Sequence, residues 1–246
     1  MLELFLFILL ILSFILAHIF NYISYFARIS GKNIGFSLLG TSLAGIIIGL
    51  SQLSLLFFIP TLSFLIEKMN LSLKIYLIIF LFIFSLAALS MWLIFINKQS
   101  IISLLNKILL VHISIKKNIL SSCIIFWRYK VDNFKSLKSN YKFKFHKKML
   151  FNCIFAYLAI SSGFFISYFL AIKFPEYRLT ISSISTIIHS IGTFFLLSYV
   201  DPKLNSNVDR IENVEAWQII NSFFLSRIIS LVILFFITIF LLIFII

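Results

Sequence analysis

Two histidines within apolar runs, His18 and His189, are the side chains best placed to transfer a proton inside the apolar part of this chain. Acid–base catalysis would need a group that orients the imidazole, and neither histidine has an obvious carboxylate partner. The sequence also lacks the motifs GxxxxGK[ST], HExxH and GxSxG and a paired DxxD. Catalysis is therefore poorly supported, no cofactor or metal is expected, and conduction or translocation is favoured.

Further polar side chains gather at the edges of the apolar runs. They are Asn21, Arg28 and Lys32 after the first run, Asp201 at the end of the fifth, and Asn221 and Arg227 at the start of the sixth. Together they predict a cationic rim around a cytoplasmic opening, because arginine binds pyrophosphate oxygens through charge-assisted hydrogen bonds. The alternative is that Arg28 and Arg227 only reach the lipid interface and fix the topology.

Small and polar residues also recur at helical spacing within two of the apolar runs. The second run carries Ser37, Thr41, Gly45 and Gly49, then Ser51, Gln52 and Ser54; the fifth carries Ser182, Thr186 and Ser190 beside Ser185, His189 and Thr193. Small residues in membrane helices usually permit close packing, and Gly45 with Gly49 forms a GxxxG motif. A stripe that also contains Gln52 or His189 favours a wet groove, because burying such groups without partners costs several kcal/mol.

The elements that must position these residues are membrane helices. Of the 246 residues, 61% are hydrophobic and 12% charged, and the mean hydropathy is +1.10, which excludes a soluble domain. Apolar runs of about 20 residues predict an all-α polytopic membrane protein, whereas β-barrel strands would be half as long and alternate in polarity. Six spans are predicted: Leu4 to Ile23, Ile34 to Pro60, Leu73 to Ile96, Met149 to Ile172, Leu179 to Val200 and Phe223 to Ile246.

The net charge of +13 comes mainly from one loop, residues 97–148, which holds 12 of the 21 Lys and Arg residues and one acid, Asp132. The excess indicates anionic lipid or topology before nucleic acid. The positive-inside rule places this loop in the cytoplasm and both termini outside. The first span, with Glu3 and no basic residue before it, is interpreted as a membrane anchor and not as a signal peptide.

Part of the basic loop has the pattern of an amphipathic helix over residues 101–121. Apolar residues recur every three or four positions at Ile101, Leu104, Leu105, Ile108, Val111, Ile115 and Ile119, and Ser103, Asn106, Lys107, Ser114, Lys117 and Ser121 mark the other face. This pattern predicts a helix lying at the interface, in contact with anionic lipids. Its lysines either only hold the loop on the bilayer or take part in handling a substrate.

The loop divides the spans into halves of three, residues 1–96 and 149–246. An odd number of spans per half gives the halves opposite orientations, which is the arithmetic of an inverted repeat.

The two cysteines, Cys123 and Cys153, have neither a metal-site nor a disulfide spacing.

Several motifs resemble the Amj-type alternative lipid II flippases of bacteria. The family pattern H-x6-Y-x2-R-x2-G is matched by His18, Tyr25, Arg28 and Gly31. It is followed in the chain by Ser42-Leu43, the string S-Q-L-S from Ser51, Pro60 and Leu62. Near the end of the chain, the segment from Tyr199 to Lys203, with Asp209, resembles the family's V-D-P turn before the last helix. Two departures are informative. The family has Glu where this chain has Asn21 and Arg where it has Gln52, while Leu55 stands where the family has Asn. An acid and a base lost together suggest an ion pair replaced by an Asn21–Gln52 amide pair.

The resemblance implies translocation of undecaprenyl-pyrophosphate-linked disaccharide-pentapeptide to the outer leaflet of the bacterial plasma membrane, for cell wall biogenesis and cell shape. We expect Arg28 and Arg227 to capture the pyrophosphate and His18, Gln52 and His189 to line its path, with Asn21, Tyr25 and Asp201 in the same site. The alternatives are a membrane enzyme acting on polyprenyl-phosphate lipids and a structural subunit of a membrane complex. The oligomeric state is not indicated by the sequence.

Overall fold

The structure is a computed structural model that describes residues 2–68, 71–115, 121, 144–210 and 214–245. In this part of the chain every regular element is helical. The elements are α1 (Leu2–Asn33), α2 (Ser37–Lys68), α3 (Leu73–Ile96), α4 (Lys98–Ile115), α6 (Lys147–Lys173), η2 (Pro175–Tyr177), α7 (Arg178–Phe195), η3 (Leu196–Val200), α8 (Asp201–Val208) and α9 (Val214–Ile245). Six helical segments are long and apolar enough to cross a membrane, which confirms the predicted class of multi-pass helical membrane protein.

The helices differ from the apolar runs mainly at their ends. α1 continues beyond Ile23 to Asn33, and α2 continues through Pro60 to Lys68. Ile34 and Phe36, which the hydropathy pattern placed in the second span, instead flank Gly35, whose φ of 79° makes the turn between α1 and α2. Apolar runs therefore mark the stretch that contacts hydrocarbon, while backbone hydrogen bonding extends the helices farther.

Two pairs of neighbouring helices, α1 with α2 and α6 with α7, approach each other closely at glycines. A Cβ atom at Gly40 would lie 2.6 Å from Cα of Gly31 on the neighbouring helix. One at Gly192 would lie 2.9 Å from the carbonyl oxygen of Ala156 on α6. Because glycine has no side chain, it allows this approach, as small residues commonly do in membranes.

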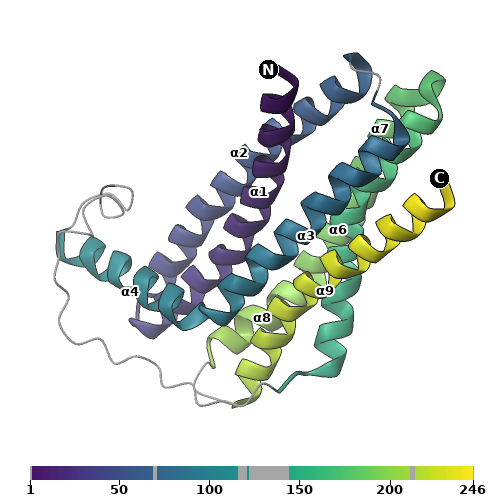
Figure 1. Cartoon of the computed structure of the whole chain (residues 1–246). Helices are drawn as coiled ribbons and strands as arrows, with labels where there is room; N and C mark the ends of the chain where they lie inside the picture. Colours follow the sequence, from purple (N-terminus) through teal and green to yellow (C-terminus); the bar gives the residue numbers. More distant parts are fainter. Residues whose placement is uncertain (1, 69–70, 116–120, 122–143, 211–213, 246) are drawn as a thin grey trace.

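The remaining long helices join the two pairs. α3 packs against α9, α1 also contacts α3, and α6 also contacts α9. Both halves thus use equivalent pairings, although an inverted repeat stays a prediction. Figure 1 shows both termini at one end of the bundle and α4 and α8 at the other. The side of the membrane that each end faces also stays a prediction, from the positive-inside count.

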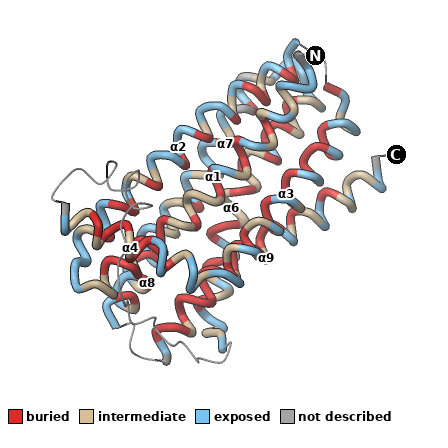
Figure 2. The backbone as a smooth tube through the Cα atoms, turned by 60° about the vertical axis from the view of Figure 1, so that its left-hand side comes forward, coloured by how far each residue is buried: buried red, intermediate tan, exposed pale blue. Residues whose placement is uncertain are grey.

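The core is aromatic and the outer surface is apolar. Phe26 stacks on Phe224 with ring centroids 4.3 Å apart, and Tyr76 stacks on Phe165 at 6.0 Å. Every long helix has a buried side facing other helices and an exposed side facing outward (Figure 2). Large exposed residues such as Phe57 and Phe236 are suited to lipid contact.

α4 lies within the segment predicted to be an amphipathic interfacial helix. Its apolar residues Leu105, Ile108 and Val111 are buried, and the helix packs against α1. Asn106, which the pattern placed on the polar face, is only 3% exposed, so that assignment is wrong. Residues 116–120, with Lys117 and Ile119, lie outside the described residues, as does Asp132. Contact of this helix with anionic lipid stays a prediction.

Candidate functional site

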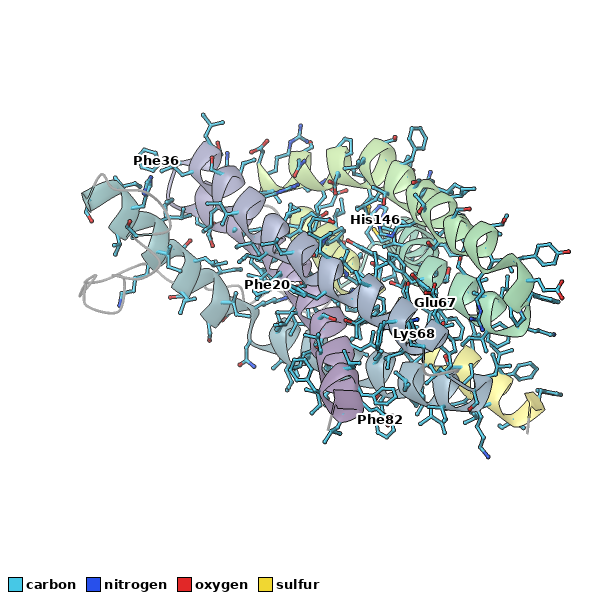
Figure 3. All side chains as sticks on the ribbon, turned by 90° about the horizontal axis from the view of Figure 1, so that it is seen from above. Phe20, Phe36, Glu67, Lys68, Phe82 and His146 are labelled. Carbon is cyan, nitrogen blue, oxygen red and sulfur yellow. The ribbon has the colours of Figure 1, made fainter. Side chains whose placement is uncertain are left out.

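Three cavities follow one another along α2, between the α1–α2 pair and the α6–α7–α8 segment. The α8-end cavity, about 330 Å³, is bordered by Ser37 and Thr41 of α2. The central cavity, about 130 Å³, is bordered by Ser51, Gln52 and Leu55, and the termini-end cavity, about 420 Å³, by α2 from Ile59 to Glu67. Phe36, just before α2, and Glu67, in its last turn, lie at opposite ends of this row (Figure 3).

The row is long enough to cross a bilayer. From Ser37 to Glu67, α2 rises about 45 Å at 1.5 Å per residue, which matches the thickness of a bilayer including its headgroups. Phe164 of α6 lines both the central and the termini-end cavity, so these two share a wall. The α8-end cavity shares no lining residue with the central one: along α2 it ends at Thr41, and the central cavity begins at Ser51.

Arg227 is the principal charged residue of the central cavity. It lies near the middle of α9, is only 4% exposed, and donates a hydrogen bond from Nη1 to Oδ1 of Asn21 at 2.8 Å. Its guanidinium also lies 4.8 Å from the ring centroid of Tyr157. Among the described residues, no carboxylate lines this cavity or pairs with Arg227. A buried cation without an acidic partner is costly in a membrane and suited to an anionic ligand.

Three buried polar atoms around the same cavity have no hydrogen-bond partner in the described structure: Nδ1 of His18, Oη of Tyr157 and Nε of Arg227. The ring of His18 packs on Phe14, with centroids 4.3 Å apart. By contrast, Nδ1 of His189 lies 3.3 Å from the carbonyl oxygen of Ile160, and Ser51 donates to the carbonyl oxygen of Ala17 at 2.7 Å. Each of these atoms is itself buried, so a ligand or water would reach it only after neighbouring side chains move apart.

At the α8 end, polar side chains of α1 and α8 meet in register. Tyr25 donates to Oδ1 of Asp201 at 3.0 Å, and Arg28 donates to Oδ1 of Asn205 at 2.9 Å. One turn further, Nζ of Lys32 lies 3.8 Å from Oδ1 of Asp209 at the end of α8. Positions 201, 205 and 209 are four residues apart and therefore share a helix face. These contacts, the α1–α8 ladder, join α1 to α8 at that end of the bundle.

The chain reaches this register through a local irregularity. η3 is a π-helical segment, Leu196–Val200, directly before Pro202. Proline lacks a backbone N–H and its ring crowds the carbonyl of the residue four positions earlier, here Ser198. The wider π turn accommodates this and sets the direction of α8. The helix thus continues past Asp201 to Val208, where the apolar pattern had placed the end of the span at Val200.

The termini-end cavity combines one acid and one base with hydroxyl groups. It is lined by Glu67 of α2 and Arg178 of α7, and the hydroxyls of Ser63 and Tyr168 lie 3.0 Å apart within it. No group of three His, Cys, Asp or Glu side chains in the described structure is placed to hold a metal ion.

The polar stripe of α2 faces open space. A Cβ atom at Gly45 or Gly49 would meet no atom within 4 Å, and both glycines are exposed. The packing interpretation of this GxxxG motif is therefore wrong for the described contacts, and close packing occurs instead at Gly31, Gly40 and Gly192. On α7, His189 and Thr193 line the central cavity and Thr186 the termini-end one, while the side chain of Ser182 is not described.

The predicted site residues separate into two groups. His18, Asn21, Gln52, His189 and Arg227 all line the central cavity. At the α8 end lie Arg28, Asp201 and Tyr25. The two cations there, Arg28 and Lys32, are balanced in charge by two carboxylates, Asp201 and Asp209. Arg28 and Arg227 therefore do not form one cationic rim. No direct hydrogen bond joins Asn21 and Gln52 in the described structure, where the Asn21 oxygen accepts from Arg227. Both side chains line the same cavity, so a water-bridged amide pair stays a prediction.

Sequence reasoning missed Tyr157 and Asn205. Tyr157 was one aromatic residue within an apolar run, and nothing distinguished it from core residues. Asn205 stands four residues after Asp201, which is the spacing of one helix face, but the apolar pattern ended the helix at Val200.

Lys98, at the start of α4, is a further, half-buried cation near the α8 end. Its Nζ donates to Oδ1 of Asn221 at 2.7 Å and lies 5.6 Å from the ring centroid of Trp217. Burial lowers the pKa of Lys98 to about 8.

Comparison with known protein families places most of the chain in a family model. A sequence model described as Amj, Alternate to MurJ, matches residues 12–243, nearly the whole chain. No curated protein and no solved structure matches the chain.

Proposed function

We propose, on the premise that the chain belongs to the Amj (Alternate to MurJ) family, that it moves the peptidoglycan precursor lipid II across the bacterial plasma membrane. The family name designates a substitute for MurJ, a lipid II flippase. The proposed direction is from the cytoplasmic to the outer leaflet, for cell wall synthesis. The chain acts as a lipid transporter in this proposal, and not as a catalyst.

The observation that carries the proposal is the unpaired charge of Arg227 in the middle of the bundle. Lipid II has a pyrophosphate between its prenyl tail and its sugars, and a translocase must stabilise these negative charges at mid-membrane. Arg227 supplies a guanidinium with one hydrogen bond to Asn21 and an unpartnered Nε. Charge-assisted hydrogen bonds from such a group to phosphate are about twice as strong as neutral ones.

The row of cavities supplies a path for the polar headgroup. α2 packs chiefly on α1, and α7 chiefly on α6, so α2 and α7 make few contacts along the seam between them. The open side of α2 at Gly45 and Gly49 and the exposed Gln52 lie along this seam. In the proposal the headgroup moves along the seam while the prenyl tail stays in the surrounding lipid.

The membrane potential is the proposed driving force. The sequence contains no nucleotide-binding loop. Moving one negative charge outward across an inside-negative membrane is favoured by about 2.3 kcal/mol per 100 mV. Arg227 would lower the barrier at mid-membrane without moving across it.

Replacement of Arg227 tests the function. We expect Arg227→Gln to abolish rescue of a bacterium depleted of its own lipid II flippase, and to abolish lipid II translocation by the purified chain in vesicles. Arg227→Lys, which keeps the charge but loses the planar donor fork, should retain part of the activity. Arg210→Gln is the matched control, because Arg210 is exposed and lines none of the three cavities.

The variants must be produced and inserted in the membrane at the level of the unchanged chain. Full translocation by Arg227→Gln at that level would contradict the proposal. A failure of the unchanged chain to translocate lipid II in vesicles, with or without a potential, would reject the function itself.

A further inference from the structure

The three cavities differ in their balance of charge. In the α8-end cavity, Arg28 and Lys32 face Asp201 and Asp209. In the termini-end cavity, one guanidinium accompanies one carboxylate, Glu67. The central cavity has Arg227 and two imidazoles and, among the described residues that line it, no acid. Selective attraction for an anion is therefore concentrated in the central cavity.

Buried polar atoms without a hydrogen-bond partner have the same distribution. Three side chains of the central cavity each have one such atom, and their exposures are 7% for His18, 2% for Tyr157 and 4% for Arg227. Each end cavity has one such atom, Nε of Arg28 and Nε of Arg178. Much of the remaining polar surface at the ends is already paired, as in Tyr25 with Asp201 and Ser63 with Tyr168.

Size then limits what the central cavity can bind. Its volume is about 130 Å³, whereas pockets that enclose a drug-sized ligand measure about 300–1,000 Å³. A disaccharide-pentapeptide is larger than a typical drug, so the central cavity cannot enclose it, and in the proposal it passes along the seam outside this cavity. A phosphate or diphosphate group fits, and its oxygens match the donors available there. Phe14, Phe164 and Leu196 form apolar walls, and the neutral polar lining includes Gln52, Ser161 and Thr193.

We propose that this protein selects its lipid by the diphosphate and not by the sugars or the peptide, so that polyprenyl diphosphates are its substrate class. Undecaprenyl pyrophosphate without any sugar is then a ligand of the same site, as are polyprenyl diphosphates that carry other glycans. This inference rests on the proposed function and goes further, because it assigns specificity to the central cavity alone. The end cavities give passage to the remainder of the headgroup without selecting it.

Competition binding tests the inference. The full-length chain, purified in detergent, is loaded with fluorescent lipid II and titrated with three competitors: unlabelled lipid II, undecaprenyl pyrophosphate, and the soluble disaccharide-pentapeptide without phosphate. We expect undecaprenyl pyrophosphate to compete within about threefold of lipid II, and the soluble headgroup to show no competition at about 100-fold higher concentration.

Two variants link this result to the cavity. Arg227→Gln should weaken lipid II and undecaprenyl pyrophosphate by the same factor, about 10- to 100-fold, because both lose the same charged hydrogen bonds. If Arg227→Gln does not fold, Asn21→Glu, which places an acid beside Arg227, should weaken both equally. Arg210→Gln should change neither.

The outcomes separate the two proposals. Binding of lipid II with no competition from undecaprenyl pyrophosphate, or with strong competition from the soluble headgroup, would overturn the inference and leave lipid II translocation standing. Unequal effects of Arg227→Gln on the two lipids would also overturn it. If lipid II itself does not bind, both proposals are rejected.

Discussion

The net charge of the central cavity is the property that we expect to control activity most directly. Asn21 accepts a 2.8 Å hydrogen bond from Arg227, so a carboxylate introduced by Asn21→Glu would pair with that guanidinium. Two unit charges about 4 Å apart interact by about 4 kcal/mol at an effective dielectric constant of about 20. An anionic ligand would have to displace this internal partner, which corresponds to a loss of affinity on the order of 10³-fold.

A compensating change lies in the same cavity. Gln52 lines it together with Asn21, so Gln52→Arg would return the net charge to its original value. In the double variant the new acid and the new base cancel, and Arg227 remains as the excess cation. We expect Asn21→Glu alone to be inactive and the double variant to regain most of the activity.

The assay is a double-mutant cycle, read out by rescue of a flippase-depleted bacterium and by lipid II binding to the purified chain. Asn21→Gln is the control, since it has the length of glutamate without its charge. Equal activity of Asn21→Glu and Asn21→Gln would refute the reasoning. A folded double variant as inactive as Asn21→Glu would show that the position of the acid, and not the net charge, determines the effect.

Four further predictions address other parts of the molecule. Gly40→Leu should strongly lower the melting temperature, because its side chain would overlap Gly31, whereas Gly49→Leu, which meets open space, should fold normally and slow translocation. Arg28→Ala should abolish rescue of the flippase-depleted bacterium by removing the bond to Asn205, and normal growth would contradict its role. Arg227→Leu should leave the melting temperature unchanged or raised while removing lipid binding. Burial lowers the pKa of Lys98 from 10.5 to about 8. Between these two pH values the folded chain binds fewer protons at Lys98 than the unfolded chain does. The contribution of Lys98 to the free energy of unfolding therefore rises with pH between about 8 and 10.5. The pH midpoint for acetylation of Lys98, followed by mass spectrometry, should lie near 8 in the folded protein and near 10.5 after denaturation.

The helical class and the residues of the central cavity could be predicted because each depends on a local signal. Twenty apolar residues can cross a bilayer only as a helix in this composition. Polar residues inside such helices are costly, so His18, Gln52 and His189 stood out without knowledge of any contact. Their positions on three different helices, and their meeting in one cavity, required the structure.

Pairing between distant helices could not be predicted. The sequence prediction paired Asn21 with Gln52 because the family has an acid at the first position and a base at the second, and this chain has neither. Such a correlated change reflects a shared electrostatic environment as readily as a direct contact. In the structure both residues line the same cavity while Asn21 bonds to Arg227. Similarly, Arg28 and Arg227 appeared equivalent at the membrane edge. The continuation of the chain through η3 into α8 gave Arg28 the partner Asn205 and left Arg227 with no acid in the described structure.

The energetics of Arg227 explain why a ligand, more than the fold, accounts for this residue. A charged side chain at the centre of a membrane helix costs about 2.5–3.5 kcal/mol on insertion scales. A hydrogen bond to a charged group returns about 1.5–3 kcal/mol, here from Asn21, and a desolvated cation–π contact returns about 2 kcal/mol, here from Tyr157. These contributions roughly cancel, so Arg227 adds little to the stability of the empty protein. Its Nε and the neighbouring groups of His18 and Tyr157 stay unpartnered. An arrangement that tolerates a cation and leaves its donors open is suited to an anion that arrives and departs, as a translocated diphosphate must.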